Sequence, residues 1–148
     1  LQTVYVAIGA TVEDSSGNAI TASYATFTTV QNTTTTAPTV TFSPANGASG
    51  VAISNNITIT FSEAVRNRDN SELTNNNIDS LITLRLNNAN GANIAFDATI
   101  DVNKRVITID PVNNLSQLQT VYVAIGASVE DSSGNAIAAT NATFTTVY

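Results

Sequence analysis

The sequence predicts an all-β domain, an antiparallel sandwich with Greek-key connections and about seven to nine short strands. Three observations support this fold class. Residues 56–61 (NITITF) alternate apolar side chains with Thr, as a strand with one buried face does. Clusters of Gly, Asn, Ser and Asp interrupt such segments at short intervals, as turns do. No stretch has the apolar spacing of an amphipathic helix, and the many Thr, Asn and Val residues favour strands and turns.

A long internal repeat organises the chain. Residues 1–30 recur at 118–147 with four differences: Thr11/Ser128, Thr21/Ala138, Ser23/Thr140 and Tyr24/Asn141. The period of 117 residues, position 118 minus position 1, is the size of one domain. We therefore expect the C-terminal strands of a preceding or strand-donating repeat at 1–30, a Thr-rich linker at 31–37 and a complete repeat module at 38–148.

The repeated unit is expected to form two strands around a turn. Residues 3–8 (TVYVAI) are apolar on both faces and predict a buried or covered strand, and residues 25–30 (ATFTTV) alternate as a half-buried strand does. Between them, SSGN at 15–18 predicts a turn in which Asp14 accepts backbone N–H bonds. In the second copy, the position of Tyr122 after a crossover predicts a tyrosine corner, with a buried ring and a bonded hydroxyl.

The middle of the chain supplies the remaining strands. Alternating apolar residues predict strands at 40–42, 56–61, 82–86 and 94–96, with turns at 44–50 and 87–91. Strands at 98–102 and 105–109 flank Asn103 and Lys104, which predict a two-residue hairpin turn. Residues 62–77 are the least regular part, and we expect a loop there with one helical turn.

Composition argues against several functions. The chain has no His, Cys or Met, so the usual general base, the soft metal ligands and the best nucleophile are missing, and we expect no enzyme. With 11 acidic and 5 basic residues, nucleic acid and anionic lipid are poor partners. No run approaches 18 apolar residues, so no membrane insertion is expected.

Three acids are candidate metal ligands: Glu63, Glu130 and Asp131. The sequence EDSSGN offers carboxylates and loop oxygens, the ligands that Ca²⁺ prefers, and calcium is the only cofactor that the sequence suggests. It lacks the spacing of an EF-hand loop. The alternative is structural: Asp131 caps its own turn and Glu63 satisfies backbone donors at a strand end.

Four charged residues in the irregular segment form a candidate interaction site: Arg66, Arg68, Asp69 and Glu72. They could bind a carbohydrate or a protein partner. A cluster of mixed sign in an Asn-rich loop also has a simpler interpretation, a solvated surface.

The order of several short motifs resembles a known family. These are PTVTFSP at 38–44, ITITFSEAV at 57–65, Tyr122-Val123, DSSGN at 131–135 and TFTT at 143–146. Together they resemble the bacterial Ig-like domain of S-layer proteins and other large bacterial surface proteins. The resemblance covers residues 38–147 and implies a β-sandwich used in tandem on the cell surface or in a secreted protein, without catalysis.

The primary hypothesis is a non-catalytic structural module: a spacer, stalk, lattice or fibre component of an extracellular or cell-surface bacterial protein. The alternatives are an adhesive or glycan-binding module that uses residues 67–77, and an accessory domain of a secreted hydrolase. The duplication adds a hypothesis about partners. Two copies of one strand pair compete for one set of positions, so residues 1–30 are exposed, displace the resident copy or pair with a neighbouring molecule. Strand exchange between molecules would run head to tail and build filaments.

Overall fold

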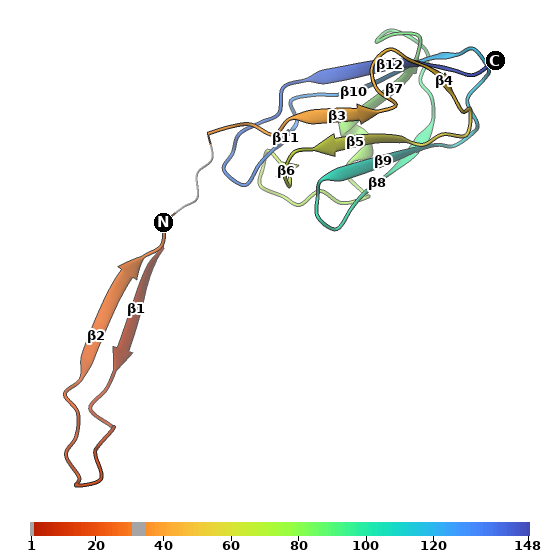
Figure 1. The fold of residues 1–148 in the computed structure, drawn as a ribbon. Coiled ribbons are helices and arrows are strands. Elements are labelled where there is room, and N and C mark those ends of the chain that lie inside the picture. The colour runs from red at the N-terminus through yellow and green to blue at the C-terminus, as the bar shows by residue number, and fades with distance from the viewer. Residues whose placement is uncertain (1, 31–34) are drawn as a thin grey trace. The chain divides into compact units, whose positions relative to one another are not determined.

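The computed structural model describes residues 2–30 and 35–148, and it confirms the all-β fold class (Figure 1). The chain divides into two compact units, Leu1–Thr33 and Thr34–Tyr148. Residues 31–34 of the predicted linker lie outside the described residues. In the described part of the chain, no helix has the length and apolar character needed to cross a membrane.

The first unit is a long β-hairpin. Strands β1 (Thr3–Ile8) and β2 (Ser23–Thr28) pair antiparallel, from Thr3 opposite Thr28 to Ile8 opposite Ser23. In the turn between them, Asp14 Oδ1 accepts the backbone N–H of Ser16 at 2.8 Å and of Asn18 at 3.0 Å. The Asn18 side chain and these N–H donors hold the pKa of Asp14 below its ordinary value.

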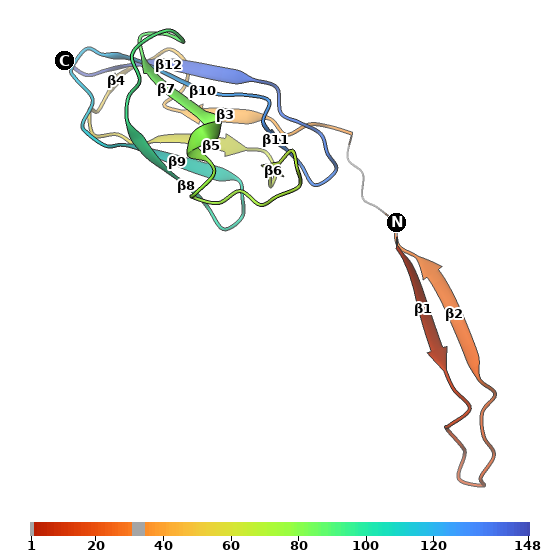
Figure 2. The same cartoon turned by 180° about the vertical axis from the view of Figure 1, so that it is seen from behind.

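The second unit is a sandwich of two four-stranded sheets, β4-β12-β10-β7 and β3-β5-β9-β8, with a short ribbon of β6 and β11 (Figures 1 and 2). All strand pairs are antiparallel except β4 with β12. The elements are β3 (Val40–Ser43), β4 (Ala48–Val51), β5 (Ile57–Phe61), β6 (Arg66–Asn67), the 3₁₀ turn η1 (Asp79–Leu81), β7 (Ile82–Leu86), β8 (Phe96–Ile100), β9 (Val106–Pro111), β10 (Thr120–Ile125), β11 (Val129–Glu130) and β12 (Thr140–Thr146).

The core lies between the two sheets. Ile57, Ile59 and Phe61 of β5 are fully buried, as their alternation with Thr predicts. They face the other sheet, where β10 and β12 contribute Val121, Val123, Ile125, Ala142 and Phe144. The repeated unit at 118–147 is therefore a central part of the core.

Strand β10 corrects one prediction about the repeated unit. Val121, Val123 and Ile125 are buried, whereas Tyr122 is only half-buried on the opposite face. Within the described residues, the Tyr122 hydroxyl makes no hydrogen bond. The predicted tyrosine corner is wrong because the two-residue period of the strand gives the core face to the aliphatic residues.

The connection from β8 to β9 is longer than predicted. Strand β8 ends at Ile100 and β9 begins at Val106, so residues 101–105 replace the predicted two-residue turn. Asp101 Oδ1 accepts the N–H of Val106 at 2.8 Å and of Arg105 at 2.7 Å. Burial opposes ionisation of this carboxyl, but these donors outweigh it and keep the pKa of Asp101 below its ordinary value. The carboxylate thus replaces backbone partners that a tight turn would have supplied.

Three other boundaries differ from the predictions. The strands predicted at 94–96 and 98–102 are a single strand, β8. Residues 44–50, expected as a turn, contain the start of β4, which pairs in parallel with β12. The irregular segment 62–77 contains the two-residue strand β6, and the helical turn follows it at Asp79–Leu81. Strands β4 and β6 are too short to produce a periodic pattern of apolar residues in the sequence.

Candidate functional site

Asp131 is the most deeply buried of the candidate acids, with no exposed surface. Its Oδ1 accepts the backbone N–H of Ser133 and of Asn135, each at 2.8 Å, and its Oδ2 accepts Asn135 Nδ2 at 2.7 Å. Gly134, with a φ of 89°, closes this turn. The structure therefore shows the Asx-type turn that was the structural alternative for Asp131.

Glu130 faces a cation of the irregular segment. Its Oε1 lies 3.2 Å from Arg66 Nη2 and accepts Arg66 Nε at 3.2 Å. The two residues are direct partners in the β6–β11 ribbon, and Glu130 is only 7% exposed. One predicted metal ligand and one predicted interaction residue thus form a partly buried ion pair that ties residues 62–77 to the repeated unit.

Glu63 does not complete a metal site with these two acids. Over residues 2–30 and 35–148, no three acidic side chains converge in a group that could hold a metal ion. Calcium binding by Glu63, Glu130 and Asp131 stays a prediction, and the observed contacts of the latter two are those of structural groups.

The other charged residues of the irregular segment have separate partners. Arg68 Nη1 donates to Ala127 O at 3.5 Å. Asp69 Oδ1 accepts the hydroxyl of Ser71 at 2.6 Å and its N–H at 2.9 Å, which lowers the pKa of Asp69. Glu72 Oε1 lies 2.8 Å from Lys104 Nζ, and this contact lowers the pKa of Glu72. Arg66 pairs with Glu130 instead, so each of the four charged residues contacts a different partner.

Two apolar residues anchor this segment to the core. Leu73 and Ile78 are fully buried. Lys104 Nζ donates to Leu73 O at 2.9 Å, and Asn77 Nδ2 donates to Glu72 O at 3.0 Å. Sequence reasoning missed this anchoring, although Leu73 and Ile78 are the only large apolar residues between positions 66 and 78. The segment is part of the packed domain at these points.

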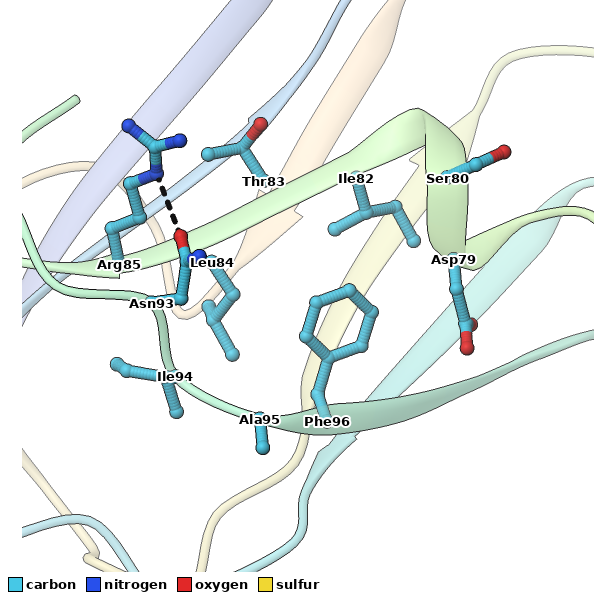
Figure 3. Close-up of a pocket in the computed structure, with 10 residues that line it drawn as sticks. All are labelled: Asp79, Ser80, Ile82, Thr83, Leu84, Arg85, Asn93, Ile94, Ala95 and Phe96. Atoms are coloured by element: carbon cyan, nitrogen blue, oxygen red, sulfur yellow. Dashed lines mark hydrogen bonds between the residues drawn. The ribbon is translucent and has the colours of Figure 1, made fainter. Parts of the chain in front are cut away.

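An open groove lies where the edge strands β7 and β8 diverge (Figure 3). Its volume is about 480 Å³, and its apolar lining includes Ile82, Leu84 and Phe96. At one end, Arg85 donates from Nε to Asn93 Oδ1 at 3.0 Å and from Nη1 to Ala89 O. Sequence reasoning did not find this groove, because its walls come from two different sheets. At the other end, Asp79 Oδ1 accepts the N–H of Ala98 at 3.2 Å and Ser80 Oγ donates to Asn77 O at 2.9 Å, so these two polar groups bond to backbone groups.

The sequence profile of the bacterial Ig-like domain family matches residues 34–146. The chain belongs to this family. The family assignment confirms the resemblance that the motifs from 38 to 147 predicted. Bacterial Ig-like domains are non-catalytic modules that occur in bacterial surface proteins.

Several solved structures are similar to this Ig-like chain. Surface layer protein SbsC, domains 1–6, superposes with a TM-score of 0.53 and 16% sequence identity, over 76% of this chain and 14% of that protein. For CopC from Methylosinus trichosporium OB3b, the TM-score is 0.48 and the sequence identity 15%, over 74% of this chain and 93% of that protein. For L,D-transpeptidase 1 of Mycobacterium tuberculosis, the TM-score is 0.42 and the sequence identity 18%, over 74% of this chain and 39% of that protein.

The chain thus spans a minor part of the surface layer protein and of the transpeptidase. A comparison with curated protein sequences finds no match. The superposition on SbsC supports the Ig-like sandwich fold.

Proposed function

We propose that this chain belongs to a row of Ig-like modules and acts as a structural spacer outside a bacterial cell, in a stalk, surface lattice or fibre. Family membership supports a surface module. The positions of the module's two ends support the spacer role, and this is the observation on which the proposal rests.

The two ends of the module lie at opposite ends of strand β12. Residues 37–40, where the chain enters the module, line one small pocket together with Ala138 and Thr140 at the start of β12. At the far end of β12, Val147 donates its N–H to Val51 O at 2.8 Å, one residue before Tyr148. The seven residues of β12 rise about 20 Å. Figures 1 and 2 both show the C-terminus at the end of the sandwich away from the segment that leads into β3.

Modules whose ends lie at opposite poles extend a chain rather than fold it back. If the predicted linker at 31–37 joins two such modules, each repeat adds at least the length of one sandwich. A row of this kind separates whatever it carries from its point of attachment, which is the physical requirement of a spacer.

Tension along such a row loads the terminal strands in shear. The first strand, β3, pairs with β5, and the last strand, β12, lies between β4 and β10. Ladder hydrogen bonds run across the strands, so a pull along β12 strains several of them together. Beside the ladder of β12, Gly47 N–H donates to Thr143 O at 2.7 Å, and Thr143 N–H donates to Asn46 Oδ1 at 2.9 Å. These contacts favour resistance to force.

Single-molecule pulling between the two termini tests the proposal. We expect one major unfolding event that releases about 36 nm, roughly 110 residues at about 3.5 Å each less the folded length. Asn46→Ala removes the acceptor of Thr143 N–H and should lower the unfolding force, whereas Asn141→Ala, at an exposed site on β12, should not. A module that yields at a force no higher than the hairpin at residues 2–30 would contradict a load-bearing role.

Glycan binding and an accessory role in a secreted hydrolase stay predictions. Because Arg66 is paired with Glu130, Arg68→Ala is the cleaner test of glycan binding by the irregular segment. Loss of binding to a glycan array in this variant, with an unchanged melting temperature, would favour the adhesive alternative.

A further inference from the structure

The hairpin at residues 2–30 carries the same apolar face that the hairpin at 118–147 presents to the core of the Ig-like module. Five of its large apolar residues are exposed, while their counterparts 117 positions later are buried. The exposed fractions are 55% for Val6 and 0% for Val123, 49% for Ile8 and 1% for Ile125, 49% for Val12 and 0% for Val129, 37% for Ile20 and 2% for Ile137, and 54% for Phe27 and 2% for Phe144.

The two hairpins also have the same backbone geometry. The pairs of β1 with β2 run from Thr3 opposite Thr28 to Ile8 opposite Ser23, and those of β10 with β12 repeat them 117 residues on. The hydrogen bond from Ile20 N to Val12 O, at 2.9 Å, recurs from Ile137 to Val129 at 3.0 Å. The first hairpin therefore holds, without a core, the shape that the second has inside one.

The sequence differences between the two hairpins avoid the buried face. None of Ser128, Ala138, Thr140 and Asn141 is buried. Every buried residue of the second copy is identical in the first, so both hairpins offer the same side chains to the slot between β4 and β7. The match includes charge, because Glu13 occupies the position of Glu130, whose partner is Arg66.

The linker length favours a slot on another molecule. To replace 118–147 in its own module, the hairpin must place Val30 where Val147 lies, while Pro38 stays beside Ala138 and Thr140. These points are about 23–30 Å apart along the strand. The eight steps from residue 30 to residue 38 reach at most about 26–29 Å when fully extended. Exchange within one chain would leave the linker taut, whereas exchange between chains would not.

We propose that residues 2–30 bind a second copy of this chain by occupying the slot that residues 118–147 fill in the Ig-like module. We call residues 118–147 the resident hairpin and residues 2–30 the leading hairpin. In the unsubstituted chain the resident hairpin already fills this slot, so an exchange replaces one set of contacts by an identical set. Binding becomes measurable when the resident hairpin is impaired and the leading hairpin is intact.

Val123→Glu provides that situation in the full chain. The substitution places a carboxylate at a fully buried position of the resident hairpin, which then no longer fits the slot. We expect the V123E chain to fold through the leading hairpin of a neighbour. Light scattering should show a mass at least twice that of the monomer, rising with concentration, together with a cooperative thermal transition. A folded monomer, or a chain that stays unfolded at all concentrations, would overturn the proposal.

Two further variants isolate the contribution of the leading hairpin. Val6→Glu changes the equivalent exposed position, and this variant should be a monomer that melts like the unchanged chain. The double variant V6E/V123E has no usable hairpin and should lack the cooperative transition. Adding the unchanged chain should restore folding of the double variant in a 1:1 complex, whereas adding V6E should not. Equal rescue by both chains, or by neither, would show that residues 2–30 do not fill the slot.

Discussion

The repeated hairpin allows one core substitution to be compared with its own internal control. Phe144 is 2% exposed and belongs to the core between the sheets, whereas Phe27, its counterpart in the first hairpin, is 54% exposed. The flanking residues from 142 to 147 and from 25 to 30 are identical. The two Phe→Ala substitutions therefore remove the same ring from the same local sequence, and they differ only in whether the ring is buried.

The expected magnitudes differ widely. Phe144→Ala removes a buried ring and leaves a cavity, which costs about 3–5 kcal/mol of unfolding free energy. For a domain of this size, that loss lowers the melting temperature by roughly 10–20 °C. Phe27→Ala alters an exposed ring in the other unit, so the module's stability should change by less than about 0.5 kcal/mol.

Urea and thermal unfolding of both variants, followed by circular dichroism at low protein concentration, give the two values. A similar loss in both variants, or a larger loss for Phe27→Ala, would refute the assignment of 118–147 as the resident hairpin. The same experiment bears on exchange between chains. If a neighbour's intact hairpin can fill the slot, the loss in Phe144→Ala should shrink as the protein concentration rises.

Three other predictions follow from single contacts. Asp131→Ala leaves backbone donors of a buried turn without their acceptor and should cost the module about 2–3 kcal/mol in urea unfolding, while Asp14→Ala in the exposed copy should leave it unchanged. Leu73→Ala should cost about 3 kcal/mol and increase proteolysis of residues 68–78; unchanged proteolysis would show that Leu73 does not hold this segment. Lys104 lowers the pKa of Glu72, so the pair stabilises the fold above the ordinary pKa of this carboxyl, near 4.5, and the contribution is lost as the pH falls through its lowered value. Glu72→Gln should therefore reduce the difference between the melting temperatures at pH 6 and pH 3.

Much of the fold could be predicted from residue patterns. The alternation at 56–61 and at 82–86 identified β5 and β7, because one face of each strand must be apolar to be buried. The elements that were missed are those without a period. Strands β4, β6 and β11 owe their existence to partners far away in the sequence, and no local pattern encodes such partners.

The residues of the candidate site could be singled out from the sequence, but their contacts could not be predicted. The sequence singles out Glu130, Asp131 and Arg66, and it offers a structural alternative for the acids. Only the folded chain pairs Arg66 with Glu130 across 64 positions, and only there does the groove between β7 and β8 appear. Contacts of this kind depend on how the strands are ordered in the sheets. The same pattern of apolar and polar residues is compatible with several strand orders, so the pattern alone does not predict these contacts.

The sequence by itself determined the strand pattern, the family and the shape of the repeated hairpin, because alternation, turn residues and cross-strand register are local properties. The tertiary structure decided which copy of that hairpin is buried. Residues 1–30 and 118–147 are nearly the same peptide, yet Phe27 is exposed and Phe144 lies in the core. Burial depends on the surface that a segment meets, and the second copy meets strands β4 and β7 and the opposite sheet.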